Sequence, residues 1–375
     1  MATDSLPIGQ RTTTVRDVVG RLSRLDRFLP LWILLAMALG LGLGALVPGL
    51  PGQLDRLRIG TVSLPIAFGL LWMMYPVLAR VKYEELRHIG GAWRLLGVSL
   101  LLNWVVGPVL MFALAWLFLP DHTDYRTGLI LVGIARCIAM VLIWNHLAGG
   151  SAEHAAVLVA LNSVFQIATY ALYAYLFLAV FPVWLGLGEA QEVRIGFGAI
   201  ATSVLVFLGL PLVAGVISRI VGVRARGKDW YDGVAMPKIA PTALVALLFT
   251  IVIMFSLQGE TILARPGDVL RVALPLAVYF ALMFGVAFWW GWRAGFPYDQ
   301  TTTLAFTAAG NNFELAIAVA VGLFGITSGQ ALAAVIGPLI EVPALVALVY
   351  VALWLGRKLR YGRGTAVPAT PVEGV

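Results

Sequence analysis

The hydrophobic residues of this chain fall into long runs instead of short alternating or amphipathic patterns. Most runs have roughly 20 residues, the length that an α-helix needs to cross a hydrocarbon core about 30 Å thick. Strict alternation of apolar and polar residues, typical of membrane barrels, is absent. Because a helix satisfies its own backbone hydrogen bonds in lipid, the pattern predicts ten membrane-spanning helices, at residues 30–48, 58–79, 95–119, 127–147, 155–181, 195–218, 239–257, 269–292, 301–323 and 330–356.

The composition agrees with a protein whose surface mostly faces lipid. Hydrophobic residues make up 60% of the chain and charged residues 12%, against roughly 45–50% and about 25% in a soluble domain. Residues 1–29 are polar and basic, and no small-residue cleavage site follows them. We therefore expect an all-α polytopic membrane protein with a cytoplasmic segment at 1–29, one transmembrane domain at 30–356 and a cytoplasmic tail at 357–375.

The basic residues are divided unequally between the two sides of the predicted bundle. With the N-terminus inside, 19 of the 26 Lys and Arg residues fall in cytoplasmic segments and six on the opposite side, while Arg136 lies inside a span. This bias follows the positive-inside rule and predicts that both termini are cytoplasmic, in a multi-pass protein of the plasma (inner) membrane. The net charge of +7 thus marks topology and predicts no nucleic-acid partner.

Several functions are excluded by what the sequence lacks. No G-x-x-x-x-G-K-[ST] run for nucleotide binding occurs, so any energy for transport is expected from an ion gradient and no ATPase partner is required. The lone cysteine excludes an internal disulfide and a multi-thiol metal cage. No cofactor is expected.

The fourth and ninth predicted spans each contain a glycine followed by polar or reactive residues. A shift of 177 residues places Gly133-Ile-Ala-Arg-Cys137 on Gly310-Asn-Asn-Phe-Glu314. Paired, glycine-interrupted spans at corresponding positions are typical of the binding site of a transporter built from inverted repeats. We therefore predict two inverted five-helix repeats, at about 30–181 and 195–356, with interrupted fourth and ninth helices. A chance match of two glycine-containing helices is the alternative.

Three ionisable residues are predicted near the middle of the membrane: Arg136, Glu314 and Glu341. A charge at that depth costs roughly 2.5–3.5 kcal/mol on insertion scales, so it is rarely accidental. One interpretation is an Arg–Glu pair that only docks helices. However, one Arg can neutralise only one of the two carboxylates, and the other is a candidate for reversible protonation. The sequence leaves open which Glu takes which part; we expect that Glu314 titrates and Glu341 is the fixed partner of Arg136.

Cys137 has two interpretations. A single cysteine is usually a small buried hydrophobic residue. Here it follows Arg136, whose fixed positive charge favours the thiolate, and thiolates prefer soft ions and metalloids. The neighbouring Arg136 and the pairing of its span with that of Glu314 favour a soft ligand.

Three motifs together resemble the arsenite efflux permeases of the Acr family, in the bile acid/arsenite/riboflavin transporter superfamily. These motifs are G-I-A-R-C-I-A-M-V-L-I-W-N from Gly133, G-N-N-F-E-L-A-I-A-V-A from Gly310 and I-G-P-L-I-E-V-P-A-L-V from Ile336. The resemblance covers nearly the whole chain. It implies ten helices with discontinuous fourth and ninth helices that cross at the site, and efflux of arsenite, in some members antimonite, in exchange for protons.

The resemblance also implies roles for individual residues. The essential cysteine of the family matches Cys137, the soft ligand of the metalloid, and its essential glutamate matches Glu314. Arg136, Asn311 and Asn312 would complete the substrate site, and Glu314 and Glu341 would couple protons; we expect Cys137 and Glu314 to lie within about 10 Å. His146 stands where an acidic residue is expected, which puts details of cytoplasmic gating in doubt.

Other functions remain open on the residues alone. In a sodium-coupled organic-anion transporter of the same fold, Arg136 would bind a substrate carboxylate. An intramembrane enzyme with Cys137 as nucleophile would need a base, and no His lies at that depth. A sensor or scaffold would not need three buried charges. The sequence therefore favours a transporter, not an enzyme, whose partners are arsenite or antimonite, protons and the lipid bilayer.

Overall fold

The computed structural model describes most of the predicted transmembrane domain. It describes residues 28–47, 58–59, 62–82, 93–138, 140–187, 197–264, 266–359 and 361. The predicted cytoplasmic segment 1–29 lies outside the described residues except for 28–29. Of the predicted tail, residues 357–359 and 361 are described.

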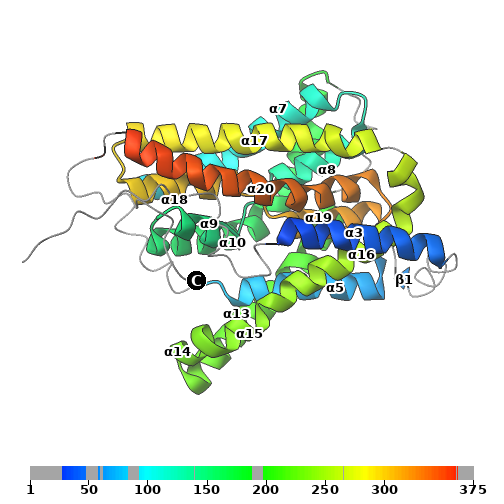
Figure 1. Cartoon of the computed structure of the whole chain (residues 1–375), viewed down its shortest axis with the longest axis horizontal. Helices are drawn as coiled ribbons and strands as arrows, with labels where there is room; N and C mark the ends of the chain where they lie inside the picture. The colour runs from blue at the N-terminus through cyan, green and yellow to red at the C-terminus, as the bar shows by residue number, and fades with distance from the viewer. Residues whose placement is uncertain are drawn as a thin grey trace, which may run out of the picture.

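Helices occupy each of the ten ranges predicted from the hydrophobic runs. The main helices are α3 (Leu29–Leu46), α5 (Leu64–Ala79), α6 (Trp93–Leu101), α7 (Gly107–Phe118), α8 (Thr123–Gly133), α9 (Met140–Leu147), α10 (Ala152–Tyr175), α12 (Phe197–Val204), α13 (Leu210–Arg226), α16 (Pro241–Ala264), α17 (Pro266–Arg293), α18 (Tyr298–Ala309), α19 (Phe313–Phe324) and α20 (Gly329–Lys358) (Figure 1). Among the described residues, six continuous helical stretches are long and apolar enough to cross a membrane. The protein is therefore a multi-pass, helical membrane protein.

Short π-helical segments interrupt four of the long helices, and each lies just before a proline. Proline has no backbone N–H to donate to the preceding turn, so the chain there adopts wider turns without losing the helix. The segments are η2 (Leu102–Val106), η3 (Leu176–Val180), η4 (Leu205–Gly209) and η5 (Tyr231–Ala235); short helices α11 (Phe181–Trp184), α14 (Lys228–Trp230) and α15 (Met236–Ile239) complete these stretches.

Two boundaries differ from the sequence prediction. The predicted span 58–79 begins with a two-stranded antiparallel hairpin, β1 (Arg58–Ile59) and β2 (Val62–Ser63), and its helix starts only at Leu64. The basic stretch 219–238, predicted as a loop, is helical on both sides of Gly227, which has a φ of 84°. Charged residues lower the hydropathy there, but the helices continue past the apolar run. The resulting helical hairpin projects from the bundle at α14 and α15 (Figure 1).

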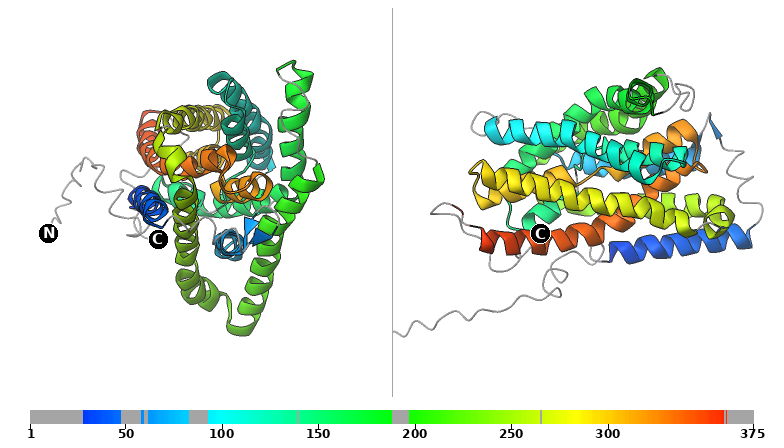
Figure 2. Two further views of the ribbon diagram at one scale, coloured as in Figure 1. Left: turned by 90° about the vertical axis from the view of Figure 1, so that its right-hand side faces the viewer. Right: turned by 90° about the horizontal axis from the view of Figure 1, so that it is seen from above.

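The helices pack in two groups. The first group contains α3, α5, α13 and α16, and α5 packs against both α13 and α16. Figure 2 (left) shows α5 between these two helices, which meet at the hairpin. The second group contains α7 to α10 and α17 to α20, in which α20 packs along α8, α17 and α19. Both helix pairs that are separated by a non-helical break, α8–α9 and α18–α19, belong to this second group.

Small residues allow the closest helix contact in the first group. A Cβ atom at Gly40 would lie 2.5 Å from the carbonyl oxygen of Val252, and one at Gly44 would lie 2.4 Å from that of Ser256. Gly42 lies between them and meets nothing within 4 Å. The backbones of α3 and α16 therefore touch along one glycine face, the arrangement that small-xxx-small spacing permits in membranes.

Candidate functional site

Two helices are interrupted at the centre of the second group, and their interruptions bind each other. α8 ends at Gly133 and α9 begins at Met140, while α18 ends at Ala309 and α19 begins at Phe313. Arg136 and Asn311 form an isolated antiparallel bridge. The amide of Cys137 donates to the carbonyl of Gly310 (3.3 Å), and that of Asn312 to the carbonyl of Ala135 (3.1 Å). Backbone groups freed by each break are thus satisfied partly by the other.

The side chain of Arg136 is fully buried and holds two helix ends together. Its Nη1 donates to the hydroxyl of Tyr279 (2.8 Å) and to the carbonyl of Ala308 (3.4 Å), and its Nη2 donates to the carbonyl of Gly133. Gly133 ends α8, and Ala308 is in the last turn of α18. The C-terminus of a helix carries partial negative charge, so these two ends stabilise the cation.

The expected ion pair between Arg136 and a glutamate is therefore wrong. Among the described residues, ion pairs join Arg219 to Asp232 and Arg271 to Asp268, and neither involves Arg136. Glu341 instead accepts a hydrogen bond from the backbone amide of Asn311 (N to Oε1, 3.4 Å). The sequence gives no measure of the helix-end charge that takes the place of a carboxylate.

The second half-helix, α19, begins with two of the predicted site residues. Asn312 is its N-cap, and its Oδ1 accepts from the amide of Leu315 (3.0 Å). Glu314 lies in the first turn, where the positive end of the helix favours a negative side chain, and is half-buried. Glu341 on α20 is buried, and its carboxylate accepts from the backbone amide of Asn311 in the second break. Two carboxylates thus lie on the helices next to the second break, whereas Arg136 is bound by helix ends and Tyr279.

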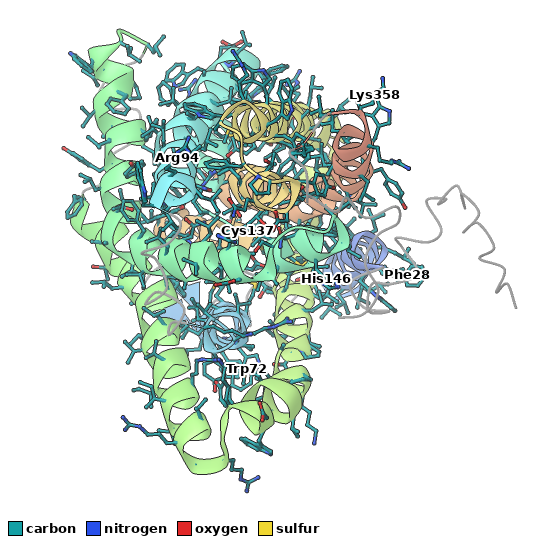
Figure 3. All side chains as sticks on the ribbon, turned by 90° about the vertical axis from the view of Figure 1, so that its left-hand side faces the viewer. Phe28, Trp72, Arg94, Cys137, His146 and Lys358 are labelled. Atoms are coloured by element: carbon teal, nitrogen blue, oxygen red, sulfur yellow. The ribbon has the colours of Figure 1, made fainter. Side chains whose placement is uncertain are left out.

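Cys137 lies in the α8–α9 break, beside the backbone of the second break. Its side chain is 2% exposed, and Figure 3 shows the residue in the interior of the bundle. A Cβ atom at Gly310 would lie 2.9 Å from Cβ of Cys137 and 3.5 Å from its Sγ. Only glycine therefore lets the thiol approach the chain so closely. The separation between Cys137 and Glu314 stays a prediction.

Hydrogen-bonding atoms remain available around this crossing. Among the described residues, four buried atoms here have no hydrogen-bond partner: Nε of Arg136, Nε2 of Gln166, Oδ1 of Asn311 and Nδ2 of Asn312. Buried polar atoms are rarely left unpaired, so each requires an explanation such as a ligand or water. Three donors and one acceptor beside a thiol can hold a small ligand with several hydroxyl groups. No group of three His, Cys, Asp or Glu residues in the described ranges could hold a metal ion.

The structure adds two residues that the sequence analysis did not select. Tyr279 on α17 binds Arg136, and Gln166 on α10 accepts a hydrogen bond from the amide of Arg136 (3.0 Å). A signal for Gln166 was present, since Asn162 and Gln166 are polar residues one helical turn apart in the fifth apolar run. Tyr279 had no such signal, because tyrosine is common in membrane helices.

Asn311 also connects the two breaks through its side chain. Its Nδ2 donates to the carbonyls of Val132 (2.8 Å) and Ala135 (3.1 Å). Five of the six predicted site residues therefore belong to one buried hydrogen-bond network: Arg136, Cys137, Asn311, Asn312 and Glu341. The sixth, Glu314, follows Asn312 in the first turn of α19 and is half-buried. Interrupted helices with a polar centre in a multi-pass protein are features of secondary transporters.

The comparisons with known proteins place the chain more closely. The profile of the Sodium Bile acid symporter family matches residues 67–265. Arsenical-resistance protein Acr3 of Corynebacterium glutamicum is 55% identical over 348 residues, 93% of this chain and 94% of the relative. Acr3 of Alkaliphilus metalliredigens is 31% identical over 87% of this chain and 92% of the relative, and the uncharacterized transporter slr0944 of Synechocystis is 34% identical over 90% and 92%.

The chain therefore belongs to the sodium/bile acid symporter family, in its arsenical-resistance (Acr3) branch. The members of this family are secondary transporters and not enzymes, which confirms the class predicted from the sequence.

Proposed function

We propose that this protein exports arsenite from the cytoplasm in exchange for protons, with Cys137 as the soft ligand and Glu314 as the proton-coupled residue of the site. The observation that carries the proposal is the position of Cys137, the single cysteine, in the break that binds the second break at the centre of the bundle. The similarity to two Acr3 arsenical-resistance proteins over most of the chain supports the substrate class.

The site suits arsenite chemically. Near neutral pH, arsenite is mainly an uncharged trihydroxide, whose As(III) centre is soft and prefers sulfur. One thiol binds it less tightly than a cage of three thiols, and a transport site must release its substrate. The unpartnered atoms of Arg136, Asn311, Asn312 and Gln166 match the donors and acceptors of the hydroxyl groups. Antimonite, with the same trihydroxide form, is a second substrate.

Glu314 and Glu341 provide the proton coupling. Arg136 is bound to helix ends and Tyr279, so it compensates neither carboxylate directly. A buried carboxylate without a cationic partner exchanges protons more readily than it holds a permanent charge. A proton bound from the outside as arsenite leaves, and released to the cytoplasm, would reset the carrier without ATP or an ATPase partner.

Two inverted repeats of five helices, at about 30–181 and 195–356, explain the crossing. The backbone amides of Arg136 and Asn311 each donate a hydrogen bond to a side chain 30 residues further along the chain. The acceptors are Gln166 and Glu341, respectively. These pairs are related by a shift of 175 residues. The shift differs by two from that predicted with Gly133 and Gly310, because the α8–α9 break is longer than the α18–α19 break.

The proposed orientation in the plasma (inner) membrane has both termini in the cytoplasm. Residues that the distribution of Lys and Arg assigns to the same side of the membrane are in contact in the structure. Arg94 reaches the carbonyl of Ala294, whereas Arg271 and His122 meet on the side assigned to the exterior. The pattern supports ten spans, four of which are interrupted or shorter than the six long ones.

A sodium-coupled transporter of organic anions is the second candidate, since the family profile takes its name from sodium symporters. That function would use Arg136 to bind a carboxylate. Both terminal nitrogens of Arg136 already bind protein acceptors, and only Nε is unpartnered. The arrangement therefore favours a neutral substrate over an organic anion.

Everted membrane vesicles that contain the full-length protein test the proposal. With an imposed pH gradient, acid inside, vesicles should accumulate arsenite, and sodium-free buffer should not change the rate. The matched control is vesicles with Cys137→Ser at equal protein level. Accumulation that requires sodium, or that is equal for the serine variant, would contradict the proposed mechanism.

A further inference from the structure

Two hydrogen bonds hold the two breaks in an equivalent way. The amide of Arg136 donates to Oε1 of Gln166 (3.0 Å), and the amide of Asn311 donates to Oε1 of Glu341 (3.4 Å). Both acceptors lie 30 residues after their donors, and the two donors are partners in the same antiparallel bridge. Gln166 is on α10 and Glu341 is on α20, each the long helix that follows an interrupted pair.

The two acceptors have nearly the same shape but different chemistry. Glutamine stays neutral, so the bond to Arg136 is independent of pH. Glutamate accepts a stronger hydrogen bond when it is ionised than when it is protonated, because bonds to charged groups are about twice as strong. The bond to Asn311 therefore depends on whether Glu341 carries a proton.

We infer that Glu341 is a proton-dependent clamp on the α18–α19 break, and that Gln166 is its proton-independent counterpart on the α8–α9 break. Glu341 acts through Asn311, so it is a positioning residue. When Glu341 is ionised, the amide of Asn311 is held; when a proton binds, this hold weakens and the residues after it, Asn312 and Glu314, gain freedom. The inference rests on the proposed function, in which this break carries the substrate and the proton.

The difference between Gln166 and Glu341 means that a proton acts on one break and not on the other. Asn311 binds the carbonyls of Val132 and Ala135 through its side chain, so a change at its amide reaches the end of α8. Of the two acceptors Gln166 and Glu341, only Glu341 is titratable. A proton on Glu341 therefore alters one half of the crossing while the other half stays fixed by Gln166, which is what a carrier with a single proton-driven step requires.

The groups that face Glu341 leave its proton free to exchange. α20 packs against α3, α8, α9, α17, α18 and α19. Glu314 lies in the first turn of α19, and the cation of Arg136 is bound at the helix ends. The other titratable or charged side chains of these helices and of α20, in the described ranges, are Asp124, Tyr125, Arg126, His146, Asp268, Arg271, Tyr279, Arg293, Tyr298, Asp299, Tyr350, Arg357 and Lys358. None of them has a hydrogen bond or ion pair to Glu341 among the described contacts.

Hydrogen–deuterium exchange of the full-length protein in lipid nanodiscs tests the clamp without any transport measurement. After correction for the intrinsic effect of pH on exchange, protection of segment 310–312 should fall on the order of fivefold from about pH 9 to about pH 5, the change expected when a charged acceptor becomes neutral. Protection of segment 135–137 should not change.

Three variants supply matched controls. Glu341→Gln should remove the pH dependence at 310–312, because it reproduces the chemistry of Gln166. Gln166→Glu should create a pH dependence at 135–137. The double exchange of Glu341→Gln with Gln166→Glu should move the pH dependence from the second break to the first. The single variant Gln166→Glu keeps the test decisive if Glu341→Gln does not fold.

Pronounced pH dependence at 310–312 in Glu341→Gln, or none there in the wild type, would overturn the inference. These outcomes are separate from a failure of the proposed function, which would show as absence of arsenite transport by the wild-type protein while the exchange pattern persists. The pH profile of arsenite uptake supplies the second readout: it should flatten in Glu341→Gln and return in the double exchange, and a double exchange that stays flat would also contradict the clamp.

Discussion

Arg136 and Asn311 lie opposite each other in an isolated antiparallel bridge, at the point where two interrupted helices cross. Each of the two residues lies in a break, next to other residues of the candidate site: Cys137 follows Arg136, and Asn312 follows Asn311. The bridge means that neither break can move without changing the other. In the proposed function, a substrate bound beside Cys137 would affect the residues that begin α19 through this bridge.

The first prediction concerns the thiol. Cys137→Ser keeps a small side chain beside Gly310 but loses the soft ligand, so the protein should fold and arsenite export should be nearly lost. Export is measured in cells, with the amount of protein in the membrane determined by immunoblot as the control. Full export by a serine variant present at wild-type level would make Cys137 a packing residue only.

The second prediction concerns the hydroxyl of Tyr279. Tyr279→Phe leaves Nη1 of Arg136 with only the long bond to Ala308. A buried donor that loses its partner costs about 1–3 kcal/mol, so thermal unfolding in detergent should begin at a lower temperature and export should decrease. Tyr173→Phe is the control, since Tyr173 makes ring contacts with Trp104 and Phe177. Equal effects of the two changes would refute a specific role for the Arg136 bond.

The third prediction separates the two glutamates. Glu314→Gln imitates a permanently protonated residue in the proposed site, so net efflux should fail and the dependence of transport on pH should be lost. Transport is measured in vesicles over a range of pH. If the variant still drives pH-dependent efflux, Glu314 is not the proton-coupled residue.

The amount of folded Glu341→Gln provides a related test. If Glu341 were the fixed partner of Arg136, as the sequence predicted, this change would leave a buried arginine unpaired, a loss of about 3–5 kcal/mol. In the structure Arg136 does not bind Glu341, and glutamine can still accept from Asn311. The variant should therefore reach the membrane at wild-type level. A large loss of folded protein would show that the two side chains depend on each other after all.

The helices were predictable from sequence because membrane insertion imposes a length and an apolar composition on each one. The positions of the two breaks were also indicated, by glycine before polar residues. The contacts of Arg136 were not, because they depend on carbonyl groups at helix ends, which leave no mark in the sequence. Charge counting therefore assigned a carboxylate to a cation that Gly133, Ala308 and Tyr279 hold.

The shift of 177 residues predicted from the glycines differs by two from the shift of 175 that relates Arg136 to Asn311, for a similar physical reason. A single shift can align two repeats only if their irregular segments have equal length. Residues 134–139 separate α8 from α9, whereas residues 310–312 separate α18 from α19. Gly133 is the last residue of α8 and Gly310 is the first residue after α18, whereas Arg136 and Asn311 are the residues that form the bridge.

The fourth prediction tests the close contact of α3 with α16. Gly44→Ala would place a Cβ atom 2.4 Å from the carbonyl oxygen of Ser256, so the helices must move apart. Overpacking of this kind costs about 1–3 kcal/mol, and the melting temperature in detergent should fall. Gly42→Ala is the matched control, because no atom lies within 4 Å of the added carbon. If both variants melt alike, the two helices do not depend on this contact.

Arsenite accumulation in cells that lack their own exporter tests the central claim most directly. Cells that express this protein should accumulate less arsenic than cells with an empty vector, and cells with Cys137→Ser at the same membrane level should accumulate as much as the empty-vector cells. Equal accumulation with and without the wild-type protein, while it is present in the membrane, would contradict the account.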